Sequence, residues 1–158
     1  MKAETLPTIR KELKNYDRDE LQEICLKLAR FKKENKELLT YLLFESTYEP
    51  GYIESVKAEI DLQLDEIEGR RFYQKKKGVR KILRSVKKYI RYSKNKETEI
   101  ILFIYFCEKL AEMRPSIKHT VLHKLYDREY ASIEKKIDKL HEDLQLDYRN
   151  MLGDLKRF

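Results

Sequence analysis

The chain has 158 residues, of which 41% are hydrophobic and 40% are charged, and its formal net charge is +7. This length is sufficient for one domain with a hydrophobic core, and the mixing of charges with Leu, Ile and Tyr excludes a disordered chain. The longest apolar run, Ile100–Cys107, has eight residues, whereas a membrane-spanning helix needs about 20. The first residues also lack the apolar core of a signal peptide, so we expect a cytoplasmic protein that does not bind membranes.

Helices are predicted along the first part of the chain, because only four Gly and three Pro interrupt the whole sequence. Pro7 opens a short helix, and Asp17 and Glu20 have the spacing of a capping box. Apolar residues then recur every three or four positions, which predicts one helix of seven or eight turns that ends near Glu45. Asn35 interrupts this apolar stripe. It either sets the register of a core seam or is exposed because the stripe drifts around the helix.

Three further helices are expected in the middle of the chain. Apolar residues over Ile53–Ile67 define one helical face, and after a glycine-containing turn a second amphipathic helix runs from about Val79 to Tyr92. Asn95 then caps a helix from about Lys96 to Met113. That helix is apolar all round, which is typical of the most buried helix of a bundle.

The C-terminal part shows a long apolar seam from Tyr126 to Leu155, with steps of three and four residues close to a heptad pattern. This seam packs either against the long N-terminal helix or against a second copy of the chain, so a homodimer is an open alternative. No linker or repeat divides the sequence. We therefore predict an all-α fold, a bundle of about five or six helices, two of them long, without a sheet, in a single helical domain over residues 1–158.

The segment Arg70–Lys96 carries thirteen Lys or Arg residues and no acidic residue. Because the whole chain has a charge of +7 and this segment alone +13, the remainder carries −6. Tyr73, Tyr89 and Tyr92 are interspersed and are candidates for stacking on bases. A helical stripe of this kind neutralises phosphates and releases counterions without reading base sequence. The candidate nucleic-acid-binding residues are Lys77, Arg80, Lys81, Arg84, Lys87, Lys88 and Arg91.

Two other partners fit the basic segment. Glu49–Glu68 holds seven acidic residues and one Lys, so an antiparallel hairpin of the two segments would neutralise part of the charge within the chain. Exposed pairs contribute only about 0–1 kcal/mol each, but they fix which helix lies beside which. Alternatively, the partner is an acidic protein. The chain is then a protein–protein interaction or scaffolding module, with the basic helix or the C-terminal seam as its interface.

Catalytic signatures are absent from the sequence, so we expect no enzymatic activity, no metal and no cofactor. The glycines are isolated, and no Gly-x-Ser-x-Gly elbow is present. His119, His123 and Asp127 have the spacing of one helical face, but HTVLH lacks the Glu of the HExxH zinc motif. Cys25 and Cys107 lie among apolar residues without a Cys-x-x-Cys pair, which predicts two reduced core residues.

The stretch IRKELKNYDRDELQEICLKLARFKKENKELLTYLLFE, from Ile9 to Glu45, combines a short helix, a capped turn and an ELxxxxLxLA pattern. A Lys/Asn/Glu-rich stretch follows and ends in an aromatic-Leu pair. This N-terminal quarter resembles the opening of small uncharacterised all-helical bacterial proteins of unknown function. The resemblance implies a bacterial, cytosolic helical protein and no activity. The helix–turn–helix also resembles the SAP-type DNA-binding motif, although Asp17–Asp19 stands in place of that motif's Gly.

Overall fold

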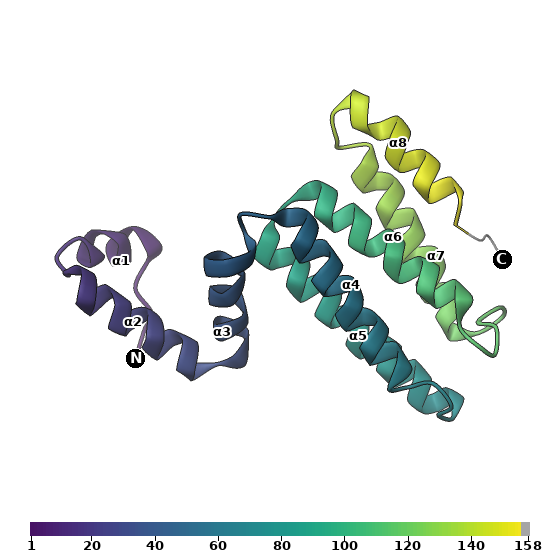
Figure 1. Cartoon of the computed structure of the whole chain (residues 1–158), viewed down its shortest axis with the longest axis horizontal. Helices are drawn as coiled ribbons and strands as arrows, with labels where there is room; N and C mark the ends of the chain where they lie inside the picture. The colour runs from purple at the N-terminus through teal and green to yellow at the C-terminus, as the bar shows by residue number, and fades with distance from the viewer. Residues whose placement is uncertain (156–158) are drawn as a thin grey trace. The chain divides into compact units, whose positions relative to one another are not determined.

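The computed structural model describes residues 1–155, which form eight α-helices, one π-helical turn and no strand (Figure 1). The prediction of an all-α fold is therefore confirmed. The helices number more than the five or six expected, because two segments predicted as single long helices are each interrupted. By contacts the chain divides into two compact units, Met1–Phe44 and Glu45–Phe158. Whether the two units fold together as the single domain expected from the sequence stays a prediction.

The first unit contains α1 (Leu6–Leu13), α2 (Arg18–Phe31) and α3 (Lys33–Thr40), and a π-helical turn, η1, follows at Tyr41–Glu45. The short first helix and the capping box are confirmed. The Asp17 side chain accepts from the Glu20 backbone N–H, and the Glu20 side chain accepts from the Asp17 backbone N–H, both at 2.9 Å. These bonds satisfy backbone donors that otherwise have no partner in the first turn of α2.

The prediction of one continuous helix up to Glu45 is wrong, because the backbone at Lys32 is extended, with φ −142° and ψ 144°. The break leaves the last carbonyls of α2 without helical donors. The Asn35 side-chain amide donates to one of them, the Leu28 carbonyl, at 2.8 Å. Asn35 is half-buried, as the reading of a partly exposed residue expected, and its hydrogen bond at the end of α2 was anticipated by neither reading.

The second unit is built around α6 (Lys96–Glu112). This helix contacts α4 (Glu49–Asp65), α5 (Phe72–Ser93), α7 (Val121–Ile137) and α8 (Glu142–Gly153). Asn95 caps α6 as predicted, because its side chain accepts from the backbone N–H groups of Glu97 and Thr98. The expectation that this is the most buried helix is also confirmed, because it has more buried residues than any other helix in residues 1–155. Its buried residues are Thr98, Ile100, Leu102, Phe103, Ile104, Phe106, Cys107, Leu110 and Ala111.

Helices α4 and α5 are consecutive and pack against each other (Figure 1). The chain turns between them at Gly69, whose φ of 72° lies in the left-handed region that glycine adopts without strain. Gly78 lies inside α5, so it is not part of the turn. The apolar face of α5 is directed toward the core of the second unit, and Val79 and Val86 are fully buried.

The C-terminal seam is divided between two helices, α7 and α8, because the chain leaves the helical conformation after Ile137 and α8 starts at Glu142. The seam residues Ile133, Ile137 and Leu152 are buried, and both helices contact α6. The seam therefore forms part of the core of the second unit. Among the helices in residues 1–155, none has the length and apolar composition needed to cross a membrane.

Candidate nucleic-acid interface

Helix α5 carries all seven candidate residues, and its amphipathic sequence determines where they lie. Ile82, Leu83 and Ile90 are buried with the two valines on one face, so the basic side chains are placed on the opposite face. Six of the seven candidates are exposed and Lys88 is half-buried. The stripe predicted from the sequence therefore exists as one charged surface of α5.

A groove between α5 and α7, with a volume of about 410 Å³, collects part of this charge. The stripe residues Arg80, Arg84 and Lys87 line it from α5, and α7 adds Lys124 and Arg128. The remaining lining residues, Leu83, Val121 and Leu125, are apolar. Lys124 and Arg128 were not predicted from the sequence, because they lie outside the basic segment. Their i, i+4 spacing on an amphipathic helix was the available signal.

Glu129 provides the carboxylate that balances part of this groove. It is 3% exposed, and its Oε1 lies 3.2 Å from Lys87 Nζ and 2.9 Å from Arg128 Nη2. The Arg128 Nε also donates to the same oxygen at 3.2 Å. The ring centroid of Phe103, from α6, is also 5.8 Å from Lys87 Nζ. One buried carboxylate thus holds two of the five cations in place, one from each helix.

The other groove cations are not neutralised in this way. Arg80, Arg84 and Lys124 have no carboxylate partner within the part of the chain that the structure describes, residues 1–155. Charged side chains in such a position remain available for a ligand with negative charge. The groove therefore has an excess of positive charge after Glu129 is taken into account.

The remaining candidates lie outside the groove. Lys77 Nζ is 4.6 Å from the ring centroid of Tyr73, and Lys88 Nζ is 4.8 Å from that of Tyr89. Lys81 and Arg91 are exposed. The side chain of Lys75, although it belongs to the basic segment, is only 6% exposed and donates to the Arg114 carbonyl at 2.5 Å. It is therefore part of the packing between α5 and the loop after α6.

The three tyrosines expected to stack on bases differ in their surroundings. Tyr73 is 60% exposed. Tyr89 and Tyr92 are half-buried and contact each other edge to face, with ring centroids 6.1 Å apart. The Tyr89 backbone carbonyl also accepts from the Tyr52 hydroxyl. Tyr73 is thus the tyrosine of α5 that presents most of its ring to solvent.

The acidic residues of α4 have partners on several elements. Asp61 pairs with Lys109 of α6 at 3.7 Å and accepts from the Tyr105 hydroxyl at 2.6 Å. Burial and this hydrogen bond raise the pKa of Tyr105. Glu54 pairs with Lys57 on its own helix. Glu49 accepts from the hydroxyls of Ser93 and Thr98. Some acidic side chains of α4 therefore pair with groups on α6 or on α4 itself, although α4 packs against the basic helix α5.

The two histidines do not share one helical face, so that expectation is wrong. His119 precedes α7 and has a φ of 62°, whereas His123 lies in α7 with Nε2 3.5 Å from Asp127 Oδ1. Thr120 caps α7 between them, which turns the chain before the helix starts. In residues 1–155, no three His, Cys, Asp or Glu side chains come close enough to share a metal ion.

The two cysteines also differ from expectation, because Cys25 is exposed. Cys107 is buried in α6 as predicted, and burial, with a smaller effect of the Glu129 charge, raises the pKa of its thiol to about 12. A thiol with so high a pKa remains protonated at neutral pH, and the thiolate is the nucleophilic form. Cys107 therefore acts as a small core residue.

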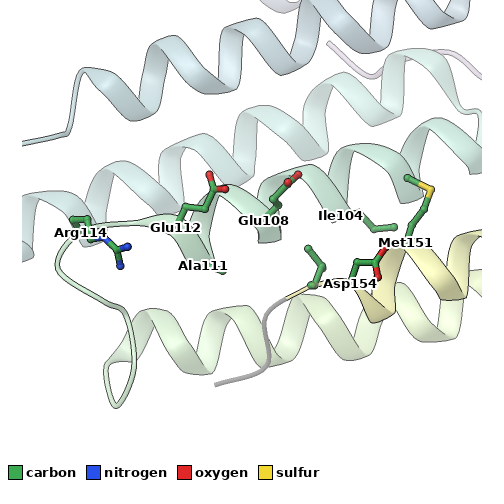
Figure 2. Close-up of a pocket in the computed structure, with 8 residues that line it drawn as sticks. Ile104, Glu108, Ala111, Glu112, Arg114, Met151 and Asp154 are labelled. Atoms are coloured by element: carbon green, nitrogen blue, oxygen red, sulfur yellow. The ribbon is translucent and has the colours of Figure 1, made fainter.

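A second cavity, of about 500 Å³, has the opposite electrostatic character (Figure 2). Glu108 and Glu112 of α6 and Asp154, which follows α8, place three carboxylates around it, and Arg114 lies at one end. Its apolar lining consists of Ile104, Ala111, Met151 and Leu155. Carboxylates repel phosphate, so this cavity does not extend the basic surface.

The fold and the groove define an all-helical protein with a two-helix basic surface. No family model, no curated protein and no solved structure matches the chain. The resemblance of Ile9–Glu45 to small bacterial helical proteins therefore stays a prediction, as does the absence of activity that it implies.

Proposed function

We propose that this chain is a non-enzymatic binding protein that associates with the backbone of nucleic acids through α5. The observation that supports this best is the exposed basic stripe, in which Arg80 and Arg84 have no carboxylate partner among residues 1–155. Phosphate groups supply the charge that such a stripe lacks, and their neutralisation releases counterions. Contacts of this type position a protein on nucleic acid but do not select a sequence. A location in a bacterial cytoplasm, where nucleic acid is accessible, belongs to this proposal.

Fluorescence anisotropy of labelled single- and double-stranded DNA and RNA, titrated with the protein from about 50 to 200 mM salt, tests the proposal. The variant Lys81→Glu/Arg84→Glu/Lys88→Glu reverses three of the seven charges of the stripe. Lys11→Glu/Lys27→Glu/Lys36→Glu makes the same change of charge on exposed residues of the first unit. We expect binding that weakens steeply with salt, is lost in the α5 variant and is largely kept in the control. Absence of binding to every probe at the lowest salt concentration would overturn the proposal.

A protein–protein interaction or scaffolding role is a second candidate. It is favoured by large apolar side chains of the first unit that are exposed, among them Phe31 at 78% and Phe44 at 74%. Exposed apolar groups that gather in a patch often mark sites of protein association. The C-terminal seam is a weaker candidate interface than the sequence suggested, because most of its residues are buried within the second unit, although Met151 is exposed. Light scattering after size exclusion tests self-association, and Phe31→Ser/Phe44→Ser should shift any dimer to monomer.

A further inference from the structure

The groove between α5 and α7 brings together cations that are far apart in the sequence. Arg80 and Arg84 lie on one side and Lys124 on the other, and Glu129 joins the two sides through Lys87 and Arg128. We propose that α7 forms the second rim of the binding site, and that Lys124 and Arg128 contact the same phosphodiester strand as α5. This inference rests on the proposed function, because it assumes that the ligand is a nucleic acid.

The spacing of the cations fits an extended row of phosphates better than one compact anion. Residues i and i+4 of a helix are separated by about 6 Å along its axis. Arg80 and Arg84 have this separation on α5, and Lys124 and Arg128 have it on α7. Each rim therefore places charges in succession along the groove, so that a strand running between the helices meets a cation from each side.

The floor of the groove determines what part of the strand enters it. Leu83, Val121 and Leu125 provide aliphatic side chains, and none of the residues that line the groove within 1–155 is aromatic. Base recognition on single strands uses aromatic side chains on which bases stack. We therefore place the sugar–phosphate backbone in the groove and the bases outside it. A single strand and one strand of a duplex both present such a backbone, and the probes below distinguish them.

Glu129 binds two of the groove cations without covering them, so they remain accessible to a ligand. Its carboxylate is buried, and it engages Lys87 and Arg128 from below through one oxygen. The side chain of Arg128 is nevertheless 66% exposed. The guanidinium can thus donate to Glu129 and still present N–H groups to phosphate, because Arg has five such donors.

The decisive variant is Lys124→Gln/Arg128→Gln, with Lys135→Gln/Lys139→Gln as a control of equal charge at exposed positions outside the groove. Both are titrated against a single-stranded and a double-stranded oligonucleotide over the same salt range, after circular dichroism has verified equal helix content. We expect the groove variant to bind at least tenfold more weakly at low salt. Loss of two phosphate contacts should also reduce the slope of log K against log salt by about 1.4 for the single strand or about 1.8 for the duplex. The control should keep the native slope.

Two results separate this inference from the proposed function. If the groove variant and its control bind alike, while Lys81→Glu/Arg84→Glu/Lys88→Glu abolishes binding, then α5 binds nucleic acid without α7 and the inference is wrong. If the native protein does not bind at all, the proposed function fails and the inference fails with it. A slope change seen with only one probe identifies which form of nucleic acid occupies the groove.

Discussion

Lys87 Nζ lies 3.2 Å from Glu129 Oε1, and this ion pair joins α5 to α7 at the base of the basic groove. The two partners differ in exposure, because the Lys87 side chain is 47% exposed and that of Glu129 only 4%. The carboxylate is therefore fixed by its surroundings, whereas the ammonium group is held from one side and open to solvent on the other. This asymmetry leads to the first prediction.

Glu129→Gln should weaken nucleic-acid binding although it makes the groove more positive. The substitution adds one unit of positive charge, which by simple attraction would strengthen binding. It also removes the charged acceptor that orients Lys87 and Arg128, so we expect a lower affinity and a smaller salt slope. Anisotropy titration of this variant beside the native protein determines whether the affinity for nucleic acid falls or rises. Tighter binding would show that Glu129 only reduces the charge of the groove.

Lys75→Met should reduce stability without changing nucleic-acid affinity. The Lys75 ammonium group is buried and donates to the Arg114 carbonyl, so its loss removes one buried hydrogen bond, worth about 1–2 kcal/mol. Lys77→Met is the matched control, because Lys77 is exposed on the same helix. It should leave the free energy of unfolding within about 0.5 kcal/mol of the native value and weaken binding instead. Urea unfolding and anisotropy together separate the two effects, and equal loss of affinity in both variants would contradict this assignment.

Gly78→Ala should destabilise the second unit in spite of the higher helix propensity of Ala. A Cβ at this position would lie 2.6 Å from Cγ2 of Ile67, so Ile67 or the helix must shift. Overpacking of this kind costs about 1–3 kcal/mol, whereas propensity returns about 1 kcal/mol. Gly153→Ala, where nothing lies within 4 Å of the added Cβ, should be neutral or stabilising. Thermal unfolding of both variants is the measurement, and a stabilised Gly78→Ala protein would contradict the prediction.

Stability should decrease at alkaline pH through Cys107. Burial raises the pKa of its thiol from 9.0 to about 12, so in this range the unfolded chain loses a proton that the folded protein keeps. The resulting stabilisation is complete below pH 9 and is lost as the pH rises toward 12, by at most about 1.4 kcal/mol per pH unit. Burial and the hydrogen bond to Glu97 raise the pKa of Tyr148 and add to the effect. Urea unfolding should therefore depend less on pH above pH 9 in Cys107→Ala than in the native protein. Cys25→Ala, which changes an exposed thiol, should retain the native dependence.

Amide hydrogen exchange should be fast in α1, α2 and α3 and slowest in α6. The first three helices contain no buried residue, whereas α6 contains nine. Asp17→Ala removes the capping bond and should speed exchange in the first turn of α2 by about fivefold, equivalent to about 1 kcal/mol. Asp19→Ala removes the same charge from that turn without a capping bond, so its effect should be smaller. Mass spectrometry of exchanged peptides measures both, and equal rates in α2 and α6 would contradict the prediction.

Local sequence signals predicted the elements that depend on local chemistry. The capping residues Asp17 and Asn95 marked true helix starts because their side chains satisfy backbone donors within three residues. The apolar run of α6 also predicted its burial correctly, because nine residues of this helix are buried. The break at Lys32 carried no such signal, because neither Gly nor Pro occurs there. Its partner, Asn35, was visible in the sequence, but its bond to Leu28 depends on the folded geometry.

The candidate site was predictable only in part. The stripe on α5 follows from helical periodicity, so Arg80, Arg84 and Lys87 were found. The contribution of α7 depends on how α5 and α7 pack around α6, and this packing places Glu129 beside Lys87 across 42 positions of the sequence. Helical periodicity does not indicate which residues come into contact when they are so far apart in the sequence. For the same reason, the burial of Lys75 against the Arg114 carbonyl was not foreseen.

Phe103 is a buried residue of α6 that contacts one of the groove cations. Its ring is 4% exposed and lies under the ammonium groups of Lys87 and Lys136, at 5.8 and 5.6 Å from the ring centroid. Both rims of the groove rest on the helix that carries it. Because buried positions are closely packed, we expect a larger or smaller side chain at this position to alter the separation of the rims while every charge is kept. Under the proposed function, we therefore expect substitutions at Phe103 to change the affinity of the surface for nucleic acid without changing its charge.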